Sequence, residues 1–279
     1  MSLWYIICEA LPFDMLQWNF LRNALLAILL MAPLFGLTST MIVTGRLSFF
    51  SDALGHSAFT GIAIGAICGF ASPTWVAVLF AVFFALLFSF VRNHSNQTAD
   101  TLIGVFSSTA VALGIFIATM GGSSFTKYNK YLIGDILSIT VTEIVLLAGV
   151  LVAVVIFWII ASNKLTLSTV YPNLASSRGI PTKIVQTCFT TAIAIIVTLT
   201  ISCVGLLILN SLLVLPGASS RNIAKNLRQY HIFSVLIALV SGIGGLIISY
   251  YLGTSAGASI SLVCALCFLI SFLLRKVRR

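Results

Sequence analysis

Apolar runs long enough to cross a membrane as helices recur from one end of the chain to the other. About 20 apolar residues in a helix span the hydrocarbon core of a bilayer, and only 8% of the 279 residues are charged, against about 25% in soluble domains. The run at 205–217 is either a separate span or the broken continuation of its neighbour. The sequence therefore predicts a single all-α integral membrane domain over 1–279, a polytopic bundle of eight or nine transmembrane helices. The expected spans are 21–43, 57–71, 74–91, 101–120, 143–161, 184–204, 205–217, 232–251 and 256–274.

Basic residues give the chain a formal net charge of +9, but they gather in loops beside the apolar runs. This is the positive-inside pattern of membrane proteins, so we expect lipid and not nucleic acid as the partner of these charges. The basic tail at 275–279 predicts a cytoplasmic C-terminus. The short N-terminal segment 1–19 lacks a basic start followed by an apolar run, so we expect no cleavable signal peptide.

Asp52 and His56 stand between two apolar runs, four residues apart. An Asp at the centre of a membrane helix costs about 2.5–3.5 kcal/mol on insertion scales. Four residues is about one helical turn, so both side chains can face one ligand. A carboxylate and an imidazole suit a divalent metal such as zinc or manganese. Two ligands are too few for a closed site, so a second subunit, another helix or water would complete it.

Other interpretations of this pair remain open. Asp52 could cap the start of a helix while His56 bonds to a neighbour, or the two groups could handle protons. Nearby hydroxyl side chains form a polar strip that could hold water; they belong to Ser48, Ser51, Ser57 and Thr60.

The segment 216–228 is the second notable stretch. Pro216 is expected to break one helix, after which a short amphipathic helix could lie across the membrane face. Its apolar side would carry Ile223, Ala224 and Leu227. Its basic side would carry Arg221, Lys225 and Arg228. Such a helix could contact a soluble partner, or the segment could be a plain basic loop. In an outer loop, Asp135 is either a docking residue or a turn residue.

The chain contains no phosphate-binding loop of the G-x-x-x-x-G-K-[ST] type, no G-x-S-x-G elbow and no H-E-x-x-H helix. We therefore expect no enzyme activity in this chain, and any nucleotide chemistry must come from another polypeptide.

Four stretches, in order, resemble the membrane permeases of zinc, manganese and iron ABC importers. The resemblance covers roughly residues 20–275. The stretches are Gly45-Arg-Leu-Ser-Phe-Phe-Ser-Asp-Ala-Leu-Gly-His56, Tyr131-Leu-Ile-Gly-Asp-Ile-Leu137, Leu174-Ala-Ser-Ser-Arg-Gly-Ile180 and Ser211-Leu-Leu-Val-Leu-Pro-Gly-Ala-Ser-Ser220.

The resemblance implies a helical bundle like that of the vitamin B12 and siderophore importers, in a bacterial inner or plasma membrane. Two permease copies, identical or different, would pair around a path, with two cytoplasmic ATP-binding subunits and an extracytoplasmic metal-binding protein as partners. Asp52 and His56 would line the metal path. A coupling segment would contact the ATPase through Pro216, Gly217, Ala218, Ser219, Arg221 and Lys225. Gly217 departs from the alanine expected there and would add backbone freedom after the helix break.

These expectations describe a subunit of an ATP-driven importer of manganese, zinc or iron, with the metal as cargo and no permanently bound cofactor. A permease for haem or a metal–siderophore chelate is the first alternative. A proton- or sodium-coupled carrier is the second. The residues do not choose among the three metals, since both ligand types accept all of them.

Overall fold

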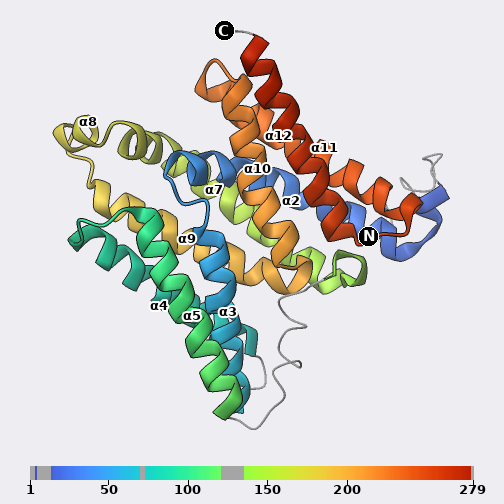
Figure 1. Cartoon of the computed structure of the whole chain (residues 1–279), viewed down its shortest axis with the longest axis horizontal. Helices are drawn as coiled ribbons and strands as arrows, with labels where there is room; N and C mark the ends of the chain where they lie inside the picture. The colour runs from blue at the N-terminus through green and yellow to red at the C-terminus, as the bar shows by residue number, and fades with distance from the viewer. Residues whose placement is uncertain (1–3, 5–13, 70–72, 121–134, 278–279) are drawn as a thin grey trace. The chain divides into compact units, whose positions relative to one another are not determined.

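A computed structural model describes residue 4 and the ranges 14–69, 73–120 and 135–277 (Figure 1). Most of the segment 1–19, the stretch 131–134 and the last two residues of the basic tail therefore lie outside the described residues. Every regular element in the described part is helical. The elements are η1 (Asp14–Gln17), α2 (Asn19–Thr44), α3 (Phe50–Ile67), α4 (Pro73–His94), α5 (Ala99–Met120), η2 (Ile136–Ser138), α7 (Val141–Val170), α8 (Pro172–Ser177), α9 (Thr182–Val204), α10 (Leu206–Ile223), α11 (Leu227–Leu252) and α12 (Ala256–Val277).

Eight of these helices, within the described residues, are long and apolar enough to cross a membrane: α2, α4, α5, α7, α9, α10, α11 and α12. They confirm the predicted polytopic all-α fold. The remaining expected span, 57–71, corresponds to α3, which begins earlier, at Phe50, and is not among the eight. α9 and α10 are separate helices, divided at Gly205, whose φ of 90° strongly favours glycine.

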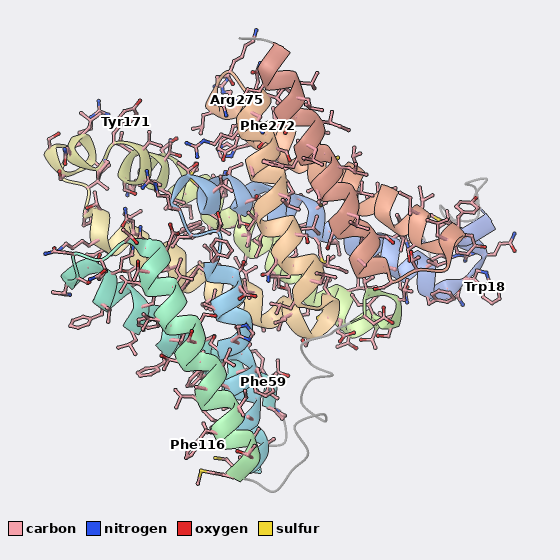
Figure 2. All side chains as sticks on the ribbon, viewed as in Figure 1. Trp18, Phe59, Phe116, Tyr171, Phe272 and Arg275 are labelled. Carbon is pink, nitrogen blue, oxygen red and sulfur yellow. The ribbon has the colours of Figure 1, made fainter. Side chains whose placement is uncertain are left out.

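Large apolar side chains cover the outward faces of several helices. On α5, Phe116 is 61% exposed, whereas Phe59 on α3 is buried (Figure 2). Leu79 on α4 and Ile159 on α7 are more than two-thirds exposed as well. Water-soluble monomers rarely show so much apolar surface, so these faces belong against lipid or another apolar chain.

The chain divides into two compact units. One comprises Met1–Thr40, Asp135–Val155 and Ser211–Arg279, and the other comprises Met41–Gly134 and Ile156–Asn210. The expectation of a single permease domain over 1–279 stays a prediction.

In the unit that contains Asp52, α3 packs against α4, α5 and α9. Gly61 makes the α3–α4 contact possible, because a Cβ there would lie 2.5 Å from the Cα of Ala77. Near the start of α3, the ring of Phe50 lies 4.6 Å from that of Phe88 on α4. Phe88 in turn meets Phe106 of α5 edge-on at 5.4 Å. Small residues and aromatic rings thus hold α3 in the interior of this unit.

In the other unit, α2 packs closely on α11. The Ser234 hydroxyl of α11 donates to the Gly36 carbonyl of α2 over 2.7 Å. A Cβ at Gly36 would come within 2.7 Å of the Cα of Val235. Lipid offers no hydrophobic drive for helix association, so small residues and interhelical hydrogen bonds of this kind hold membrane helices together.

Candidate metal site

Asp52 and His56 lie in the first two turns of α3, on the same side of the helix. The His56 Nε2 atom is 3.5 Å from Asp52 Oδ2. The side chain of Asp52 is 43% exposed and that of His56 is 29% exposed, although α3 is otherwise largely buried. The two side chains thus lie close together, as their spacing predicts, and both are partly exposed.

The capping interpretation of Asp52 is not what the structure shows. The residue at the start of α3 is Phe49, and no side chain caps the helix there. The two carboxylate oxygens of Asp52 instead face His56 and an amide on another helix. The carboxylate is thus aimed at other side chains and not at the helix backbone.

That amide belongs to Asn210, which sequence reasoning missed. Its Nδ2 donates to Asp52 Oδ1 over 3.2 Å, from a position 158 residues further along the chain. Gly55 allows this approach, because a Cβ there would overlap the side chain of Leu206 at the start of α10. The one available signal was an amide side chain inside the apolar run 205–217.

Two of the four hydroxyls near the pair, those of Ser57 and Thr60, do not belong to the water-holding strip that the sequence suggested. Ser57 is fully buried and donates to the Leu54 carbonyl of its own helix over 2.8 Å. Thr60, also fully buried, reaches the Ala110 carbonyl on α5 over 2.8 Å. Backbone carbonyls thus accept from both hydroxyls: Ser57 bonds within α3, whereas Thr60 joins α3 to α5.

Within the described ranges, no group of three or more His, Cys, Asp or Glu side chains converges on one point. Among these residue types, the structure thus groups Asp52 with His56 alone in the described part of the chain, and their role as metal ligands stays a prediction. A closed shell requires donors of another kind or from another chain.

The segment 216–228 differs from the prediction. Pro216 does not break a helix, because α10 continues through it to Ile223. No separate amphipathic helix follows; a short turn leads directly into α11 at Leu227. The turn is fixed by Asn226, whose side chain accepts from Gln229 N over 2.8 Å, while the Gln229 side chain accepts from Lys225 N over 3.0 Å. This reciprocal pairing resembles a capping box.

The six proposed coupling residues differ in how deeply they are buried. Arg221 and Lys225 are exposed, Ala218 is half-buried, and Pro216, Gly217 and Ser219 are buried within their own unit. The idea that Gly217 adds backbone freedom is also wrong, since it is an ordinary helical residue of α10. It permits close packing instead, because a Cβ there would lie 2.7 Å from the carbonyl oxygen of Ser39 on α2.

Asp135 is exposed and caps the short helix η2. Its Oδ1 accepts from the backbone N–H of Leu137 over 3.0 Å. This supports its role as a turn residue and is consistent with the position of Asp135 at the start of η2.

The eight long apolar helices define a multi-pass membrane protein, and the Asp52–His56 pair on α3 is its candidate metal site. The chain belongs to the ABC 3 transport family, whose model matches residues 17–275.

Similar proteins include metal transport permeases. The high-affinity zinc uptake system membrane protein ZnuB of Haemophilus influenzae is 28% identical over 89% of this chain and 93% of its own length. The manganese import system permease protein ScaB of Streptococcus parasanguinis is 27% identical over 94% of this chain and 93% of its own. The solved structure of PsaBC from Streptococcus pneumoniae, in complex with Fab, has a TM-score of 0.77 and 27% identity, covering 98% of this chain and 95% of that one. The family thus includes zinc and manganese permeases of ABC transporters.

Proposed function

We propose that this chain is the permease subunit of an ATP-driven importer of a divalent transition metal: manganese, zinc or iron. Two permease copies form the path, two cytoplasmic ATP-binding subunits drive it, and an extracytoplasmic metal-binding protein delivers the cargo. The observation that carries this proposal is the Asp52–His56 pair, 3.5 Å apart and partly exposed on an otherwise buried helix.

The pair suits transient binding. A carboxylate and an imidazole attract a divalent ion, but so few ligands from one chain cannot hold it as a structural site does. A second copy would present the same two groups across a two-fold axis and complete the shell. Weak, shared coordination is what a transport path needs, because the ion must leave as readily as it enters.

Energy coupling is proposed for the exposed charges at the end of α10. Arg221 and Lys225 are exposed and would contact the soluble partner, and the Asn226–Gln229 pairing fixes the turn between α10 and α11. The buried residues Pro216, Gly217 and Ser219 then serve to position this end of the helix. Movement of the ATP-binding subunits would shift α10 and α11 together, as alternating access by rigid-body motion requires.

Metal uptake into cells tests the function directly. We expect Asp52→Ala and His56→Ala each to abolish accumulation of radioactive manganese or zinc while the complex still assembles. Asp100→Ala, which removes an exposed carboxylate at the start of α5, is the matched control and should transport normally. Undiminished uptake in both site variants would defeat the assignment.

The alternatives predict different outcomes. An ion-coupled carrier would lose uptake when an uncoupler collapses the proton gradient, and it would need no ATPase. A chelate permease would restore growth of metal-starved cells only with haem or a siderophore complex. Uptake of bare ions that depends on ATP supports the importer.

A further inference from the structure

We propose that Asn210 is a third metal ligand in this chain, supplying an amide oxygen beside Asp52 and His56. The inference rests on the proposed function, since it extends the same site. Each chain would then contribute three donor atoms to the metal: one imidazole nitrogen and two oxygens.

The first support is the position of the amide. Asn210 Nδ2 lies 3.2 Å from Asp52 Oδ1, and the other Asp52 oxygen faces His56 Nε2 at 3.5 Å. The three side chains are therefore contiguous, with the carboxylate in the middle. Two oxygen ligands at right angles around an ion with bonds of about 2.1 Å lie about 3 Å apart, close to the spacing seen here.

The second support is the environment of the oxygen atom of the same amide. The Asn210 Oδ1 atom is buried and has no hydrogen-bond partner among the described residues. Buried polar atoms in folded proteins are almost always paired, so an unpaired one calls for a reason. Because the buried oxygen has no hydrogen bond to lose, a half-turn of the amide breaks only the bond to Asp52, and it places the oxygen beside the carboxylate.

The two orientations correspond to two states of the site. Without metal, the amide N–H donates to the carboxylate and holds it in place. With a cation between them, the amide presents its oxygen, because two oxygens then share the positive charge. Asn210 would thus exchange a hydrogen bond for a metal bond without moving its helix.

The added oxygen bears on which metal is preferred. Oxygen donors suit manganese, whereas zinc readily takes a tetrahedral shell with nitrogen ligands. Removing Asn210 should therefore weaken manganese binding more than zinc binding.

Direct binding of Mn²⁺ and of Zn²⁺ to the purified full-length permease, by equilibrium dialysis, tests the assignment. We expect Asn210→Leu, similar in size but without an oxygen, to weaken Mn²⁺ binding about tenfold or more, and Zn²⁺ binding by a smaller factor. Asn210→Asp, which keeps the size and supplies a charged oxygen, should bind Mn²⁺ at least as tightly as the native chain. Thr198→Val removes another buried, unpaired oxygen of the same unit and should change neither affinity.

The outcomes distinguish a wrong assignment of Asn210 from a wrong assignment of the whole metal site. If Asn210→Leu leaves both affinities unchanged, Asn210 is no ligand. If it lowers both affinities equally, Asn210 only positions Asp52. Weaker Mn²⁺ binding by Asn210→Asp would overturn the assignment as well. If Asp52→Ala itself retains full binding, the proposed site fails, whatever Asn210 does. Melting curves of each variant identify any loss of affinity that comes from misfolding.

Discussion

The backbone N–H of Gly217 on α10 donates a hydrogen bond of 2.8 Å to the hydroxyl of Ser39 on α2. The same hydroxyl lies 3.4 Å from the carbonyl of Val214, to which it donates. Between these two contacts stands Pro216, which has no N–H and crowds the preceding turn. Ser39 thus supplies polar contacts on both sides of the proline, and α10 continues through it.

We predict that Gly217→Ala destabilises the protein. Its Cβ would lie 2.7 Å from the Ser39 carbonyl oxygen, so α2 and α10 must move apart. Overpacking of this kind typically costs about 1–3 kcal/mol, and thermal unfolding of the purified protein measures it. Gly149→Ala on α7 is the control, since no atom lies within 4 Å of a Cβ there. Equal melting temperatures for the two variants would show that the close approach is unimportant.

Thr60 should contribute to stability through its hydrogen bond to the Ala110 carbonyl of α5. We expect Thr60→Val to lower the free energy of unfolding by about 1 kcal/mol, as interhelical hydrogen bonds in membranes usually do. Thr109→Val is the matched control, because Thr109 is exposed and bonds only within its own helix, to Val105. If both variants have the same free energy of unfolding, the α3–α5 hydrogen bond does not stabilise the protein.

The proposed coupling role of α10 predicts an effect of charge reversal. Arg221→Glu combined with Lys225→Glu should abolish metal uptake and weaken binding of the ATP-binding subunit, because both charges are exposed at the proposed contact. Pull-down from solubilised membranes measures the association. Lys164→Glu, an exposed basic residue of α7, should behave like the native chain. Normal assembly of the double variant would place the coupling contact elsewhere.

Asp135 offers a test that separates docking from local structure. Asp135→Asn keeps an oxygen that can cap η2 through Leu137 N but removes the negative charge. If Asp135 also docks the metal-binding protein, the affinity for that protein falls severalfold at low salt and the difference narrows at high salt, where screening weakens charge pairs. Surface plasmon resonance with the permease in nanodiscs measures both. An unchanged affinity leaves Asp135 with its role in the turn alone.

Local patterns in the sequence predicted the parts of this fold that depend on local chemistry. The apolar runs predicted eight of the expected helices. The four-residue spacing of Asp52 and His56 predicted that their side chains lie close together. Asn210 was missed because its partner lies 158 residues away. Pro216 was misjudged for a similar reason, since the serine that supports it stands on α2. Both errors concern polar contacts between distant helices, which no single segment reveals.

The polarity of α3 has a consequence for how the protein is made. α3 is buried against helices that are each apolar enough to enter a bilayer, yet α3 itself is not among them. A segment carrying Asp52, His56 and several hydroxyls partitions poorly from the translocon into lipid by itself. Its neighbours α4, α5 and α9 are all synthesised later. We therefore expect α3 to reach its buried position only after those helices have been made.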